Sequence, residues 1–97
     1  MSHELRIRPR AIAEAQAIVA YEEQRSRSRA ERFLNELEAC YRYVEQNPLG
    51  FQVRYKQFRH AMVKGFRYRI VYAVVGDRII VYQIRHTSRR PSKRFGP

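Results

Sequence analysis

Apolar residues alternate with polar ones over residues 66–86, which is the periodicity of a β-strand. Before the turn, the apolar residues at every second position are Phe66, Tyr68, Ile70, Tyr72 and Val74. After Gly76-Asp77, residues 79–84 form a β-branched and aromatic run. A two-residue loop with glycine first is typical of a type II′ turn. The stretch therefore predicts a β-hairpin.

The same turn predicts a pairing register for the two strands. If Val75 faces Arg78, the expected pairs are Ala73 with Ile80, Val71 with Tyr82, Arg69 with Ile84, and Arg67 with His86. These pairs would share one face of the sheet. That face is apolar near the turn and basic at the open end, where Arg67, Arg69 and His86 are expected to converge. The opposite face is a broad apolar surface that other elements must cover.

In the first half of the chain, apolar residues recur at spacings of three and four, as on one side of a helix. We expect a short strand over residues 3–8, then Pro9 at a helix start and a helix over residues 10–24. A second helix is expected from Ser28, which forms a capping box with Glu31, to Asn47-Pro48. The two apolar stripes are Ala11, Ile12, Ala15, Ile18 and Val19 in the first helix and Ala30, Phe33, Leu34, Leu37, Tyr41 and Val44 in the second.

With only residues 25–28 between them, the two helices should pack as an antiparallel hairpin, with their stripes on the apolar face of the sheet. Residues 51–57 read as extended chain or loop, and residues 58–64 as a strand that turns at Lys64-Gly65. Residues 87–97 form a basic C-terminal tail. The order β-α-α-β-β-β predicts one α+β domain over residues 1–97, with a helical hairpin on one face of a small, mainly antiparallel sheet.

The charge is strongly positive, with 20 Lys and Arg against 9 Asp and Glu, or +11 at pH 7. Arginine offers a planar fork that suits phosphates and carboxylates, so we expect an anionic partner, either a nucleic acid or an acidic protein. The lone Cys40 excludes an intramolecular disulfide, and within a helical pattern it is expected to be a small buried side chain. His3, His60 and His86 lack metal-ligand spacing, so neither a metal nor a cofactor is expected. Without an apolar run long enough to span a membrane, the expectation is a cytoplasmic protein.

Several segments, in this order, resemble the RelE/ParE superfamily of bacterial type II toxin-antitoxin systems. They are EAQAIVAYEEQ, AERFLNELEACYRYVEQNP, YRIVY with its VGDRIIVYQI return, and the closing RHTSRRP. The resemblance implies a toxin that is held inactive by a cognate antitoxin, in a toxin-antitoxin hetero-oligomer. The superfamily contains two mechanisms on one fold: RelE-like members cut mRNA on the ribosome, and ParE-like members poison DNA gyrase.

For RelE-like cleavage, the resemblance implies that His86, Arg69 and Arg89 form the catalytic set. Arg69 and Arg89 match phosphate-stabilising arginines, and His86 would supply the acid or the base. Phe95, however, stands where RelE has a tyrosine that is central to its chemistry, and phenylalanine carries no proton to transfer. For this reason, and because the helices are long, the sequence favours ParE-like action on gyrase over the alternative of mRNA cleavage. A further alternative is a non-catalytic basic nucleic-acid-binding protein.

Two surfaces are expected to bind partners. The basic residues expected to contact nucleic acid or another target are Lys64, Arg67, Arg85, Arg90 and Arg94. The apolar half of the hairpin face is expected to be exposed and to bind an acidic antitoxin, through Val71, Ala73, Ile80, Tyr82 and Ile84. Tyr72 and Tyr82 either stack on bases or pack within the sheet.

Overall fold

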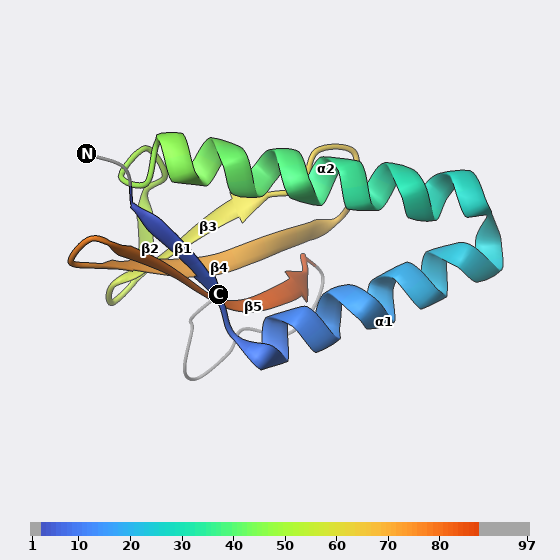
Figure 1. Cartoon of the computed structure of the whole chain (residues 1–97), viewed down its shortest axis with the longest axis horizontal. Coiled ribbons are helices and arrows are strands. Elements are labelled where there is room, and N and C mark those ends of the chain that lie inside the picture. The colour runs from blue at the N-terminus through green and yellow to red at the C-terminus, as the bar shows by residue number, and fades with distance from the viewer. Residues whose placement is uncertain (1–2, 88–97) are drawn as a thin grey trace.

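A computed structural model describes residues 3–87, in which two helices cover one face of a five-stranded sheet (Figure 1). In chain order the elements are β1 (Glu4–Ile7), α1 (Pro9–Arg25), α2 (Arg27–Gln46), β2 (Val53–Tyr55), β3 (Phe58–Met62), β4 (Tyr68–Val75) and β5 (Arg78–His86). The strands lie in the order β1-β5-β4-β3-β2; β1 runs parallel to β5, and the other neighbours are antiparallel. The predicted α+β architecture is confirmed. Residues 51–57 contribute the short edge strand β2.

The helical hairpin turns at a single residue, Ser26, and its turned end reaches past the ends of the strands (Figure 1). Ser26 has an extended backbone, and its Oγ accepts a hydrogen bond from the Arg29 backbone N–H at 3.0 Å. The predicted cap at Ser28 is therefore wrong, because Ser28 already lies inside α2. A one-residue link leaves the two helices side by side and antiparallel (Figure 1).

The core lies between the helices and the sheet. Its largest fully buried residues on this side include Phe33, Val44, Val63, Ile70, Tyr72, Ile79, Val81 and Ile84. The Tyr72 hydroxyl donates to the Pro48 carbonyl oxygen at 2.9 Å and so ties β4 to the chain just after α2. Cys40 is buried as predicted, its Sγ donates to the Met62 carbonyl at 3.5 Å, and burial raises the pKa of the thiol to about 11.

The β4–β5 hairpin has the predicted turn but only half of the predicted register. Gly76 adopts a left-handed φ of 62°, as the first position of a type II′ turn requires, and Ala73 pairs with Ile80. Beyond that, β5 contains one extra residue: Tyr72 pairs with Val81, but Val71 pairs with Gln83. This β-bulge at Tyr82 shifts every later pair by one residue, which exchanges the two faces of the strand.

The bulge overturns three predicted pairs. Val71 does not pair with Tyr82, Arg69 pairs with Arg85 instead of Ile84, and His86 pairs with Tyr68 instead of Arg67. Ile84 consequently turns into the core under the helices. Arg85 turns to the opposite face, beside Arg69.

The predicted exposed apolar patch on the outer sheet face is absent from the described part of the chain. Val71 and Ala73 are fully buried in a second small cluster with Phe58, which Tyr55 and Tyr82 flank. Phe58 and Tyr82 meet edge to face, with their ring centroids 5.4 Å apart. Ile80 and Tyr82 are half-buried. Of the five residues expected to be exposed there, Val71, Ala73 and Ile84 are therefore inaccessible.

Candidate functional site

The open end of the β4–β5 hairpin separates the expected site residues into two groups. His86 lies beside Tyr68, with the two rings edge to face at 5.2 Å, on the side that faces the helices. Arg69 pairs with Arg85, and neighbouring residues of a strand point to opposite faces. His86 and Arg69 are thus on opposite sides of the sheet, and their predicted convergence is wrong. Arg67 and His86, in contrast, line the same pocket.

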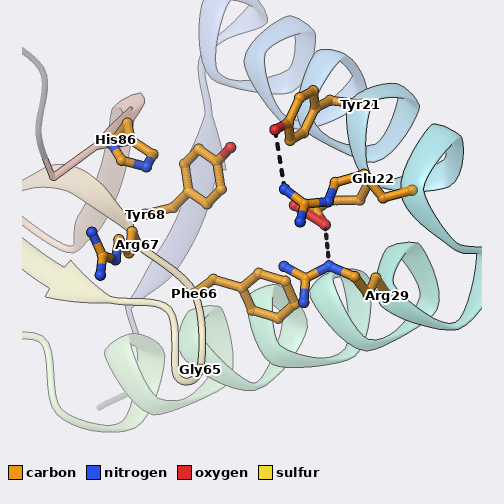
Figure 2. A pocket seen from close by; sticks show the side chains of 9 residues that line it. Tyr21, Glu22, Arg29, Gly65, Phe66, Arg67, Tyr68 and His86 are labelled. Carbon is orange, nitrogen blue, oxygen red and sulfur yellow. Dashed lines mark hydrogen bonds and ion pairs between the residues drawn. The ribbon is translucent and has the colours of Figure 1, made fainter.

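This pocket, which we call the hairpin pocket, lies between the turned end of the helices and the start of β4 (Figure 2). Its volume is about 720 Å³. The helices contribute Tyr21, Glu22, Arg25 and Arg29, the loop before β4 contributes Gly65, Phe66 and Arg67, and the strands contribute Tyr68 and His86. Gly65 has a left-handed φ of 79°, which lets the chain turn tightly into the pocket wall.

A buried carboxylate, that of Glu22, lies among the basic side chains of the hairpin pocket. Glu22 is 3% exposed, and its Oε2 accepts a hydrogen bond from Arg29 Nε at 2.8 Å. The hydrogen bond and the charge of Glu22 raise the pKa of Arg29. Arg29 also lies over the Phe66 ring, 5.5 Å from its centroid, and Arg25 donates to the Tyr21 hydroxyl at 3.2 Å. The sequence analysis did not predict Glu22 as a site residue. The feature that could have indicated it is a carboxylate in line with the apolar stripe of the first helix.

A second basic site lies on the outer face of the sheet. Arg85 and Arg54 lie near Arg69 on this face. The pKa of Arg69 is lowered, first by burial, then by the charge of Arg85 and then by that of Arg54. Arg85 is almost completely buried, and Arg69 Nε makes no hydrogen bond within residues 3–87. Such a cluster is suited to holding an anion. Arg69 thus has a basic neighbour, but this neighbour is Arg85 and not His86.

An apolar groove runs along the surface between α1 and α2 (the helix groove), with a volume of about 360 Å³. It is lined by Ile7, Ile12, Ala15, Gln16, Val19, Leu34, Leu37 and Tyr41. Ile12 and Leu34 are each 47% exposed, although both were expected to pack on the sheet. They lie at the edges of their apolar stripes, and these stripes are too wide to be buried entirely by one sheet.

Of the remaining predicted site residues, Lys64 is the one that the structure describes. Lys64 is exposed and lines a small hollow with Cys40 and Phe51. Arg89, Arg90, Arg94 and Phe95 lie outside the described residues. Within residues 3–87, no three His, Cys, Asp or Glu side chains come together in a way that could hold a metal ion. Over the same residues, no helix combines the length and apolar character needed to cross a membrane.

The family model for the ParE toxin of the type II toxin-antitoxin system parDE matches residues 5–91. The chain belongs to the ParE toxin family. This confirms the predicted RelE/ParE superfamily, and it confirms the ParE-like branch at the level of family membership. No curated protein matches the sequence.

Solved structures show the same fold for this ParE-family chain. A chain of the chromosomal ParDE toxin-antitoxin system from P. aeruginosa has a TM-score of 0.79 and 14% sequence identity, covering 89% of this chain and 97% of that one. A chain of the archaeal RelE-RelB complex from Pyrococcus horikoshii OT3 has a TM-score of 0.54 and 16% identity, covering 93% of this chain and all of that one. Helical hairpin and sheet are thus shared with both branches of the superfamily.

Proposed function

We propose that this ParE-family toxin arrests bacterial growth by poisoning DNA gyrase, and that its cognate antitoxin neutralises it in a toxin-antitoxin complex. The observation that carries the proposal is the family match over residues 5–91. The basic charge of +11 is consistent with a target that includes DNA.

The geometry at the end of the β4–β5 hairpin argues against RelE-like cleavage of mRNA by His86 acting together with Arg69. That chemistry needs a proton-transferring group and phosphate-stabilising cations around one phosphate. His86 and Arg69 lie on opposite faces of the sheet, so they cannot serve the same phosphate without a change of register. Arg54, Arg69 and Arg85 lie together on the face away from His86.

Induced expression of the chain alone tests the proposal. We expect DNA breaks and a damage response, with mRNA intact, and we expect both signals to disappear in cells that carry a toxin-resistant gyrase. New mRNA 5′ ends that vanish in a His86→Ala or Arg69→Ala variant would instead make the protein a ribonuclease. Normal growth with full-length protein present would contradict both mechanisms.

We further propose that the helix groove, and not the outer sheet face, binds the antitoxin. The groove is an open apolar surface between two antiparallel helices, and a third amphipathic helix could bury its apolar side there. Of the sheet residues first expected to fill this role, Val71 and Ala73 are buried in the cluster with Phe58, and Ile84 lies in the core. Exposed apolar side chains such as Ile12 and Leu34 favour a partner over solvent.

A further inference from the structure

The hairpin pocket contains more positively charged than negatively charged side chains. Arg29 is paired with Glu22, but the contact of Arg25 is to the neutral Tyr21 hydroxyl. Arg67 is exposed and forms no ion pair with any described residue. Two guanidinium groups at one concave site thus remain available to an anion, and guanidinium forks bind phosphate with two parallel hydrogen bonds.

Aromatic rings make up much of the rest of the pocket wall. Tyr21 is 52% exposed at the end of α1, and Tyr68 and His86 form an edge-to-face pair on the opposite wall (Figure 2). Aromatic side chains combined with arginine are the usual means of holding a nucleobase by stacking. A simple inorganic anion would gain nothing from these rings.

Glu22 further limits the class of ligand that the pocket can bind. A carboxylate at the base of the pocket repels a purely anionic ligand, so an acidic peptide fits poorly. The Glu22 carboxylate is paired on one side by Arg29 and retains lone pairs that can accept from a ligand N–H. The amino group of a base is such a donor, and Glu accepts from these groups in nucleic-acid recognition.

The size of the site agrees with a ligand that has a flat ring, a donor group and an anionic group. About 720 Å³ is within the usual range for small-molecule sites. A second hollow of about 240 Å³, which shares Tyr21, Tyr68 and His86, continues along α1 towards Glu14. The hairpin pocket and this hollow together offer room beyond a single ring.

We propose that the hairpin pocket binds a nucleoside phosphate, either free or as one unit of a single strand. Arg25 and Arg67 hold the phosphate, the base lies among Tyr21, Tyr68 and His86, and Glu22 accepts from the amino group of the base. The assignment is independent of the target of the toxin, since a chain that binds no nucleotide could still poison gyrase.

Fluorescence anisotropy on the purified full chain tests the proposal, with two probes: a fluorescent GTP analogue and a fluorescein-labelled single-stranded 12-mer of mixed sequence. The decisive variant is Arg25→Ala/Arg67→Ala. Its control is Arg42→Ala/Arg78→Ala, which removes the same charge from exposed positions outside the pocket. We expect the pocket variant to weaken binding about tenfold or more, and the control to change it much less.

The two probes separate the two sources of the nucleotide. If only the pocket variant weakens binding of the GTP analogue, the ligand is a free nucleotide. GMP should then compete better than UMP, because UMP lacks an amino group. The same loss for the 12-mer alone indicates a unit of a strand, and an iodocytosine base in that strand, which keeps the amino group, should photo-cross-link to Tyr21 or Tyr68. Equal weakening by both double variants, cross-links only on the outer sheet face, or binding of poly-glutamate but not of nucleotides would each overturn the assignment.

Discussion

At the scale of single residues, Tyr72 shows how a buried polar group acts on stability. Its ring is completely buried in the core, and its hydroxyl donates to the Pro48 carbonyl at 2.9 Å. Burial raises the pKa of Tyr72 from 10.0 to about 12. The folded protein therefore keeps a proton that the unfolded chain loses above pH 10, so the stabilisation by Tyr72 is fully present below pH 10 and is lost as the pH rises through 12.

Tyr72→Phe should lower the free energy of unfolding by about 1 kcal/mol at pH 7, because it leaves the Pro48 carbonyl without its donor. The phenylalanine does not titrate, so the difference between the two proteins should shrink as the pH rises from 10 towards 12. Denaturant unfolding at several pH values measures it, with the exposed Tyr43→Phe as control. A difference that stays constant up to pH 12 would contradict this account.

Single-residue environments were only partly predictable from the sequence. Cys40 is buried, as expected for a small side chain within a helical pattern. The helical period also placed Ile12 and Leu34 in the core, and both are half-exposed in the helix groove. Periodicity states which side of a helix is apolar, but not how much of that side one sheet can cover.

At the scale of elements, the link between the helices is set by Ser26. Its hydroxyl is the acceptor for the Arg29 N–H, one of the first N–H groups of α2, which have no partner inside the helix. Ser28 also matched the capping pattern, and the sequence alone did not distinguish the two serines. The backbone does, because Ser26 is extended and Ser28 is helical.

Ser26→Ala should therefore destabilise the protein by about 1 kcal/mol, as expected for the loss of a helix cap. Ser28→Ala is the matched control, and it should cost much less because it removes only an exposed contact with Ser26. Thermal or denaturant unfolding of the two variants gives the comparison. Equal losses, or a larger one at Ser28, would mean that the cap is elsewhere.

The helix groove makes a second prediction at this scale. Leu34→Asp puts a charge into an apolar groove without disturbing a buried side chain, since Leu34 is 47% exposed. We expect the variant to remain toxic but to be rescued poorly by co-expressed antitoxin, because a buried unpaired carboxylate weakens association. Leu49→Asp, at an apolar residue 66% exposed outside the groove, should still be rescued. Rescue of both variants alike would remove the groove as the antitoxin site.

The bulge in β5 explains why the sequence did not predict which of the site residues share a face of the sheet. The turn at Gly76-Asp77 was predicted correctly, and the register followed from it up to Tyr72. Nothing in the residue pattern marks Tyr82 as an extra residue, since both of its neighbours suit a strand. One inserted residue then exchanged the faces of Ile84, Arg85 and His86 and separated His86 from Arg69.

At the scale of the whole molecule, the order of elements and the basic charge were enough to predict the fold and the superfamily. Each local motif was weak, but their order along 97 residues was specific, and the family match now covers residues 5–91. Function needs more than the fold, because superfamily members with different targets share it. The hairpin pocket, the outer arginine cluster and the helix groove are the places where those targets and partners are to be sought.

The central claim is that this ParE-family chain acts on DNA gyrase. The most direct measurement is to incubate the purified chain with purified gyrase, ATP and supercoiled plasmid, then to release cleaved DNA with detergent and protease. The account predicts linear plasmid in proportion to the toxin added, only when gyrase is present, and suppressed by an equimolar amount of antitoxin. Unchanged supercoiling without cleaved DNA, from a preparation that still arrests growth, would contradict it.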